Sequence, residues 1–266
     1  MVGFPVGAKL NPKIIENPLI RTKLAIEENM KVALIADIHG NSAALDSALA
    51  DIDSMGVSQI LVAGDLVGYY YNPESVLNSL NSRLWHGVRG NHEDMLVDWL
   101  NGKGQHEVRQ KYGSGIQVAV ETLSKSSIDQ LAYLPPSRSL NIEGRSVLLC
   151  HGSPLKTDEY VYPNASIDAR SSLVSPTHDL VVYGHTHHPV VWEDAGKKIV
   201  NPGSIGQQRN GVLGAHWALW ETESHSISFH VSPYDSSELI NECRMRDPQL
   251  PYLADVLKRV RQDHNV

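Results

Sequence analysis

The sequence has few cysteines, few aromatic residues and no excess of positive charge, and it lacks a long apolar run. Its two cysteines, Cys150 and Cys243, are too few for a disulfide framework, so we expect a reduced chain in the cytoplasm. No apolar stretch approaches the ~20 residues that cross a bilayer, so no membrane segment is expected. Asp and Glu (30) outnumber Lys and Arg (23), and the net charge of −7 argues against long nucleic acids as partners.

The first 30 residues differ in texture from the rest of the chain. They contain three prolines and mixed charges, and they lack the features of a secretory signal. Either Met30 is the true start and residues 1–29 are an upstream addition, or residues 1–30 form an arm that docks on the domain. Residues 31–266 are predicted to form one domain, because a hydrophobic share of 41% over this length can bury a substantial core.

Apolar runs typical of buried strands alternate with helical patterns in the first hundred residues. Strands are predicted at 31–36, 59–64 and 84–88, and helices at 41–54, 73–80 and 94–100. This alternation indicates a partly parallel sheet that is covered by helices.

Residues 101–135 carry glycines and then two weakly amphipathic helical stretches, at 105–122 and 126–133. We expect this helical insertion to cap a cleft. Short strands follow at 138–143, 146–150, 179–183, 189–193, 197–200, 214–220 and 225–231, and a terminal helix is predicted at 252–261. The whole pattern predicts one α/β domain in which two sheets pack face to face with helices outside.

Polar residues that can bind a metal follow five of the predicted strands. They are Asp37-Ile38-His39, Gly64-Asp65, Gly90-Asn91-His92, Cys150-His151-Gly152 and Gly184-His185-Thr186-His187. Ligands of open α/β sheets bind outside the carboxyl ends of the strands, so we expect all five clusters to meet at one end of the molecule.

The expected site contains two carboxylates, one amide and five imidazoles, a donor set that suits Mn²⁺, Fe or Zn²⁺ better than Ca²⁺ or Mg²⁺. These groups exceed what one ion needs, whereas two ions about 3.5–4 Å apart, bridged by a carboxylate, would use them all. We therefore expect two divalent metal ions, with Mn favoured and Fe, Zn or Ni as alternatives. Such ions supply a metal-bound hydroxide at neutral pH.

The motifs Asp-x-His, Gly-Asp, Gly-Asn-His-Glu, His-Gly and Gly-His-x-His, in this order, resemble the calcineurin-like metallophosphoesterase superfamily over residues 31–235. The resemblance implies a four-layer αββα sandwich of two mixed sheets and a dinuclear metal centre. It implies one ion on Asp37, His39 and His187. It implies a second ion on Asn91, His151 and His185, with Asp65 as the bridge.

The resemblance also implies a catalytic role for His92, beside the scissile phosphate and not bound to metal. With an imidazole pKa near the working pH, His92 would protonate the leaving oxygen or stabilise its charge. Replacing it with alanine should leave the metal in place.

Two segments bear on the subgroup. Protein serine/threonine phosphatases of the superfamily continue Gly-Asp with Asp-Arg-Gly, and that motif is missing after Asp65. Residues 68–73 and 201–209 instead resemble small prokaryotic phosphodiesterases, although Gln208 and Asn210 replace the proline and the acidic residue that usually flank the arginine there.

We therefore expect a phosphodiesterase that acts on a small phosphodiester or nucleotide. The alternatives are a phosphomonoesterase or dinucleoside-polyphosphate hydrolase on the same centre and, more remotely, a non-catalytic scaffold for protein contacts.

Further residues are candidates for contact with substrate. Arg89 either clamps a phosphate or pairs with a surface carboxylate, and Arg209 and the amide of Asn91 could face phosphate oxygens. Tyr69-Tyr70-Tyr71 either stacks on a nucleobase or packs in the core. Asn41 either supports the metal ligands by a hydrogen bond or caps the following helix.

Overall fold

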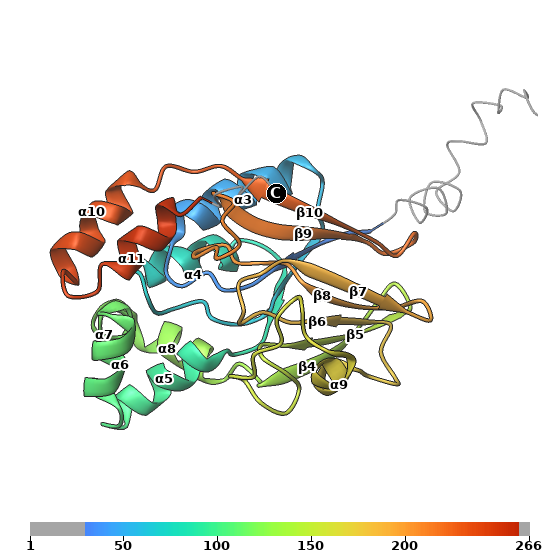
Figure 1. The fold of residues 1–266 in the computed structure, drawn as a ribbon, viewed down its shortest axis with the longest axis horizontal. Coiled ribbons are helices and arrows are strands. Elements are labelled where there is room, and N and C mark those ends of the chain that lie inside the picture. The colour runs from blue at the N-terminus through green and yellow to red at the C-terminus, as the bar shows by residue number, and fades with distance from the viewer. Residues whose placement is uncertain (1–29, 261–266) are drawn as a thin grey trace, which may run out of the picture.

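The computed structural model describes residues 30–260, and the predictions for residues 1–29 lie outside this range. Two five-stranded sheets lie face to face, and the helices lie mainly outside the first sheet and at one end of both sheets (Figure 1). The first sheet has the order β10-β9-β1-β2-β3 and the second the order β4-β5-β6-β8-β7. In the first sheet β1, β2 and β3 pair in parallel, and β9 pairs antiparallel with β1 and β10. In the second sheet β5, β6 and β8 pair in parallel, and the outer strands β4 and β7 are antiparallel, so both sheets are mixed, as predicted.

The strands lie within a few residues of their predicted positions. The first sheet consists of β1 (Lys31–Ile35), β2 (Gln59–Val62), β3 (Trp85–Gly87), β9 (Ala215–Glu221) and β10 (Ser226–Ser232). The second consists of β4 (Ser137–Ile142), β5 (Arg145–Cys150), β6 (Leu180–Val182), β7 (Val190–Asp194) and β8 (Lys197–Asn201).

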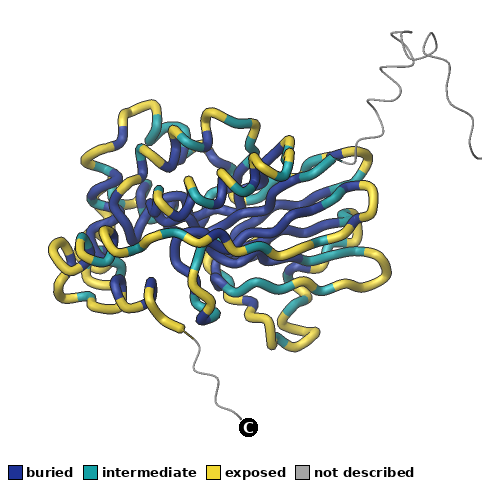
Figure 2. The backbone as a smooth tube through the Cα atoms, turned by 90° about the horizontal axis from the view of Figure 1, so that it is seen from above, coloured by how far each residue is buried: buried dark blue, intermediate teal, exposed yellow. Residues whose placement is uncertain are grey.

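The apolar core has layers because side chains alternate along each strand. Val32 and Leu34 of β1 pack in a cluster with Leu149 of β5, so this cluster lies between the sheets. Ala33 and Ile35 of the same strand belong to a second cluster with the helices outside the first sheet. The central strands are accordingly buried along their length, while the surrounding helices and loops carry the exposed residues (Figure 2).

Helices cover the two outer faces unequally. The apolar cluster outside the first sheet includes residues of α3 (Ser42–Ser54), α4 (Pro73–Asn81), α5 (Asn91–Leu100), α7 (Gly115–Thr122) and α8 (Lys125–Ala132). The outer face of the second sheet packs against a loop and the 3-10 turn Ser171–Leu173. The one-turn helix α9 (Ile167–Arg170) adds Arg170, whose guanidinium lies over the ring of Trp192 in β7. The αββα layering is confirmed, and its fourth layer is thin.

The insertion contains three helices where two were predicted, because the chain turns at Gly113. The backbone of Gly113 has φ of 80°, a left-handed conformation that ends α6 (Gln105–Tyr112) before α7 begins. The division of the chain at residues 101 and 135 stays a prediction.

The carboxyl-terminal part differs more from expectation. The helix α10 (Ser237–Arg246) was not predicted, because it buries only Leu239 and Cys243 and therefore has little apolar periodicity. The predicted helix at 252–261 is shorter, with α11 (Tyr252–Asp255) and a 3-10 turn at Val256–Lys258. None of the helices between residues 30 and 260 has the length and apolar character that a bilayer crossing requires.

Candidate metal centre

The loops that follow β1, β2, β5 and β6 meet at one end of the two sheets, near the end where α5 to α8 and α11 gather (Figure 1). Six of the seven predicted metal ligands are buried in these loops, namely Asp37, His39, Asp65, His151, His185 and His187. The seventh, Asn91, is the first residue of α5. The fold thus makes neighbours of His39 and His187, which are 148 positions apart in the chain.

Five of the seven predicted ligands have a left-handed backbone, with φ between 54° and 68°. They are Asp37, His39, Asp65, His185 and His187. A residue with a side chain pays roughly 1–2 kcal/mol for this conformation. Such residues concentrate where a fold directs side chains into a functional site. Here hydrogen bonds between the loops after β1 and β2 stabilise this conformation. The Asp65 carbonyl accepts from the N–H groups of Ile38 and His39 at 2.8 and 2.9 Å.

Asp37, His39 and His187 form the first ligand group, with candidate ligand atoms all within 4.8 Å of one another. Nε2 of His39 lies 3.1 Å from Nε2 of His187, which lies 3.5 Å from Oδ1 of Asp37. Two nitrogens bound to one ion at about 2.1 Å and at a right angle lie about 3 Å apart. The distance between the Nε2 atoms of His39 and His187 is therefore the distance expected for two nitrogens bound to the same ion.

The close approach of these two imidazoles suits a cation. Nδ1 of His39 lies 3.3 Å from the carbonyl oxygen of Val67, and Nδ1 of His187 lies 2.5 Å from that of Gln207, so each Nδ1 carries the proton. Burial is the main cause that holds the pKa of both imidazoles well below the usual value, so both rings are neutral. Two buried nitrogen lone pairs that face each other repel, and a metal ion between them removes the repulsion. The residues present fit a divalent metal.

Asp65, His151 and His185 form the second ligand group. Nε2 of His151 lies 3.1 Å from Oδ2 of Asp65 and 3.2 Å from Nδ1 of His185. Oδ1 of Asn91 also lies 3.1 Å from that Nε2, so the amide oxygen joins this group. The structure brings together all four residues that the resemblance assigns around the second ion.

The carboxylate of Asp65 lies between the two groups. Its Oδ2 is 3.1 Å from His151 Nε2 and 3.8 Å from His39 Nε2. Burial opposes ionisation of Asp65, but the charge of His151 is the largest of the causes that outweigh it and hold the pKa of this carboxyl well below its usual range. An ionised carboxylate in this position is suited to bridge two cations.

The carboxylate of Glu93 holds the loops that carry these ligands, a function that the sequence reasoning did not assign to it. It accepts hydrogen bonds from the N–H groups of Asp65 and Gly90, at 2.9 and 2.7 Å, and from that of Leu66 at 2.8 Å. Its place in the Gly-Asn-His-Glu motif was the signal that could have pointed to this role.

The end of β8 and the residues just after it hold the loops that follow β6 and β1. The amide of Asn201 donates to the carbonyl of Gly184 at 2.7 Å, and the hydroxyl of Ser204 donates to the carbonyl of Asp37 at 2.8 Å. These supporting contacts were also not predicted, because sequence alone does not show which carbonyl a polar side chain will reach.

His92 lies beside the first ligand group, with its ring centroid 4.6 Å from that of His39. Burial lowers the pKa of His92 to about 4, so the ring is neutral and does not titrate near the working pH as the sequence reasoning assumed. Its Nδ1 has no hydrogen-bond partner between residues 30 and 260. His92 also forms a group with His39 and Asp65 that could hold a metal, so its assignment as a residue that does not bind metal stays a prediction.

The candidate arginines lie in different settings. Nε of Arg89 forms an ion pair with the carboxylate of Asp94 at 3.0 Å. Of the two roles considered for Arg89, this is pairing with a carboxylate and not binding of a phosphate. Arg209 lies near the metal centre, where it donates to the hydroxyl of Tyr69 at 3.1 Å and to the amide oxygen of Gln207 at 2.7 Å.

The structure also bears on the alternative roles of Tyr69 to Tyr71 and of Asn41. Tyr69, Tyr70 and Tyr71 are buried, so they pack in the core and are not free to stack on a base. The side chain of Asn41 caps α3 by accepting from the N–H of Ala44 at 3.1 Å.

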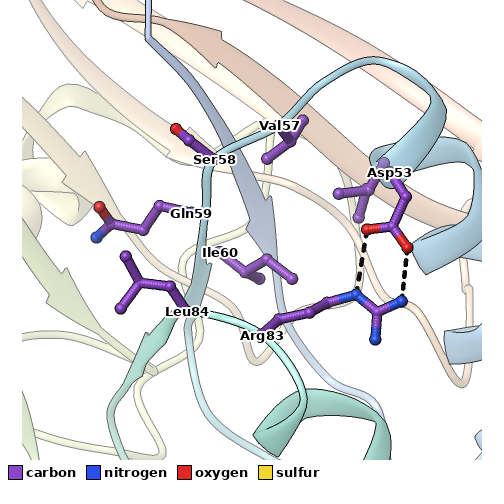
Figure 3. A pocket seen from close by; sticks show the side chains of 8 residues that line it. Asp53, Val57, Ser58, Gln59, Ile60, Arg83 and Leu84 are labelled. Carbon is purple, nitrogen blue, oxygen red and sulfur yellow. Dashed lines mark hydrogen bonds and ion pairs between the residues drawn. The ribbon is translucent and has the colours of Figure 1, made fainter.

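A hollow at the opposite end of the first sheet has no comparable chemistry. It is lined by residues at the end of α3 and the start of β2, together with Arg83 and Leu84 (Figure 3). Arg83 donates to both carboxylate oxygens of Asp53, at 3.1 and 2.6 Å, and this ion pair satisfies the one acid of the lining. The lining contains no imidazole, which leaves the other end of the molecule as the candidate site.

Comparison with known proteins agrees with this geometry. Residues 30–225 match the family model of the calcineurin-like phosphoesterase superfamily domain. A protein of Methanocaldococcus jannaschii, described as uncharacterized, is 29% identical over 222 residues, which are 77% of this chain and 88% of that protein.

Two solved structures share the fold. One is a hypothetical protein from Pyrococcus horikoshii, with a TM-score of 0.76, 19% identity, and coverage of 88% of this chain and 99% of that one. The other is a metallophosphoesterase from Sphaerobacter thermophilus, with a TM-score of 0.71, 24% identity, and coverage of 87% and 99%.

Proposed function

The chain belongs to the calcineurin-like phosphoesterase superfamily and is a phosphoesterase, and we propose that it hydrolyses a small phosphodiester or nucleotide with two divalent cations. The observation that carries this proposal is the pair of neutral, buried imidazoles of His39 and His187, whose Nε2 atoms lie 3.1 Å apart. The ionised carboxylate of Asp65 between this pair and the second group supports two ions.

The donor set supports manganese as the metal. Imidazole nitrogens and carboxylate or amide oxygens suit Mn²⁺, Fe and Zn²⁺, and no thiolate lies among the ligand groups. Cys150 and Cys243 are free and buried, which supports a reduced chain in the cytoplasm.

Hydrolysis breaks one phosphorus–oxygen ester bond, and the oxygen of a water forms the new bond. When bound, the two cations neutralise charge on the phosphoryl oxygens and lower the pKa of water. The neutral ring of His92 donates an N–H to the leaving oxygen and stabilises the charge that develops there. The carbonyl oxygen of Asn91 would hold the metal and its amide N–H would face a phosphoryl oxygen, and Arg209 would add positive charge beside the site.

The scaffold alternative predicts that ligands are lost. All seven predicted ligands are present and lie in two adjoining groups, which counts against that alternative. A phosphomonoesterase with the same metal centre would have to bind a phosphate group with two negative charges, whereas a phosphodiester carries one. A dinucleoside-polyphosphate hydrolase would need contacts to a second nucleoside.

The test is turnover by metal-free protein to which Mn²⁺ is restored, with bis-p-nitrophenyl phosphate and p-nitrophenyl phosphate as paired substrates. We expect turnover of the diester to exceed that of the monoester and to require about two equivalents of Mn²⁺. Faster turnover of the monoester would contradict the diesterase proposal. Binding of two equivalents without turnover of either substrate would contradict the proposed function itself.

A further inference from the structure

A pair of exposed tyrosine rings borders the metal centre. Tyr160 is 55% exposed and Tyr162 is 42% exposed, and their rings are stacked with centroids 5.7 Å apart and planes 14° apart. The ring centroid of Tyr160 lies 4.1 Å from that of His185, a predicted metal ligand. Open aromatic faces beside a site of phosphate chemistry are suited to stack on a flat ring of the substrate.

A cavity of about 530 Å³ adjoins the tyrosine pair, and its lining includes Pro163, which follows Tyr162 in the chain. The lining also includes His188, whose ring centroid lies 5.8 Å from that of Tyr162. The volume lies within the range of small-molecule sites. His188 directly follows the predicted ligand His187 in the chain, so this part of the lining lies next to the loop that carries that ligand.

Positive charge accompanies the aromatic rings. Arg209 and Arg259 both line the cavity. The ligand that suits this surface is anionic and carries a flat ring.

We propose that Tyr160, Tyr162 and this cavity bind the nucleoside part of a nucleotide phosphodiester while its phosphate lies at the metal centre. This inference rests on the proposed function. A nucleotide combines the required features, because its base offers a face for stacking and its phosphate brings the negative charge. A phosphodiester of a simple alcohol would leave the tyrosine faces open.

The test compares two substrates with the same reacting group and leaving group. Thymidine 5′-(p-nitrophenyl phosphate) carries a nucleoside, and p-nitrophenyl methyl phosphate carries a methyl group in its place. We expect the wild-type protein with Mn²⁺ to have a KM for the thymidine ester at least about fivefold lower, because stacking of one base on an aromatic side chain contributes roughly 1–3 kcal/mol.

Tyr162→Leu removes the outer stacking face without touching His185. We expect it to raise the KM for the thymidine ester about tenfold with little change in kcat, and to change the KM for the methyl ester much less. Tyr162→Phe should restore the low KM, because stacking needs the ring and not the hydroxyl. Tyr133→Leu is the matched control, since Tyr133 is 85% exposed at the end of α8, outside the cavity lining.

Other results of these experiments would contradict either the nucleoside proposal or the proposed function. If the wild-type protein shows equal KM values for the two esters, or if Tyr162→Leu weakens both substrates equally, the nucleoside proposal is wrong and the pair only shields the metal centre. If the wild-type protein with two bound metals turns over neither ester, the proposed function fails instead. Metal content, measured for each variant, separates loss of substrate contact from loss of metal.

Discussion

Main-chain carbonyl groups decide which imidazole nitrogens face the metal centre. Nδ1 of His151 lies 2.6 Å from the carbonyl oxygen of Ala63, and Nδ1 of His187 lies 2.5 Å from that of Gln207. Such a bond fixes both the tautomer and the orientation of a ligand ring. At the scale of single residues, the site is therefore prepared for cations before they bind.

His92 is predicted to act on the substrate and not on the metal. Replacing His92 with alanine should lower kcat by roughly 10²–10⁴, the range for groups that assist proton transfer or stabilise a leaving oxygen, while two metal equivalents remain bound. Steady-state kinetics and elemental analysis of the same sample measure the two quantities. His106→Ala, at an exposed position of α6, is the control, and a loss of metal in His92→Ala would show that His92 is a ligand.

Glu93 is predicted to act through the loops that it holds. In Glu93→Gln an amide N–H₂ group replaces one acceptor oxygen, so either the N–H groups of Asp65 and Gly90, which share Oε2, or that of Leu66, which donates to Oε1, lose their partner. We expect metal affinity to fall about 10- to 100-fold, as is typical when a group that orients a ligand is changed. Titration with Mn²⁺ measures this, with the exposed Glu107→Gln as control. Unchanged affinity would contradict the positioning role.

At the scale of elements, the loop after β2 depends on glycine. Gly68 has φ of 89°, and a Cβ placed on it would lie 1.9 Å from Nδ1 of His92. Gly68→Ala should therefore displace the imidazole and lower kcat at least about tenfold, approaching the effect of removing His92.

The control for this variant is Gly56→Ala. Gly56 has φ of 69°, and a Cβ there would meet nothing within 4 Å, so it carries similar backbone strain without a clash. Both variants should lose roughly 1–2 kcal/mol of stability from the left-handed backbone. Equal kcat in the two variants would show that Gly68 matters for the backbone alone.

Strands and ligand clusters could be predicted from sequence because they rest on local patterns. A run such as Val32 to Ile35 is apolar throughout, and only a strand buried on both faces or a buried helix explains it. The convergence of Asp37 and His187 followed from the general placement of sites at the carboxyl ends of parallel strands.

Other features depend on contacts between distant segments. The split between α6 and α7 follows from the conformation of Gly113, and the burial of Tyr69 to Tyr71 follows from packing against the carboxyl-terminal helices. The low pKa of His92 follows from burial that no local pattern shows. Tyr160 and Tyr162 had no signal in sequence, since their place beside His185 is set by the loop after β5.

At the scale of the whole molecule, the sandwich buries several ionisable groups together, so metal and protons compete for them. In the metal-free protein, burial raises the pKa of Asp37 to about 8. Burial lowers the pKa of His151, but the charge of Asp65 outweighs it and raises this pKa to about 10. Both groups therefore hold a proton at neutral pH that a metal must displace.

Metal affinity should accordingly rise with pH between about 6 and 8, by about tenfold per pH unit for each proton displaced. Calorimetry in buffers of different ionisation enthalpy counts the protons that Mn²⁺ releases at pH 7. We expect at least one per chain, and release of none would contradict the competition between metal and protons at Asp37 and His151.

The most direct test of the central claim is anomalous diffraction, at the manganese absorption edge, from crystals of the protein grown with Mn²⁺. The account predicts two peaks about 3.5–4 Å apart, one beside His39 and His187 and the other beside His151 and His185, with the carboxylate of Asp65 between them. A single peak, or peaks away from these side chains, would contradict it.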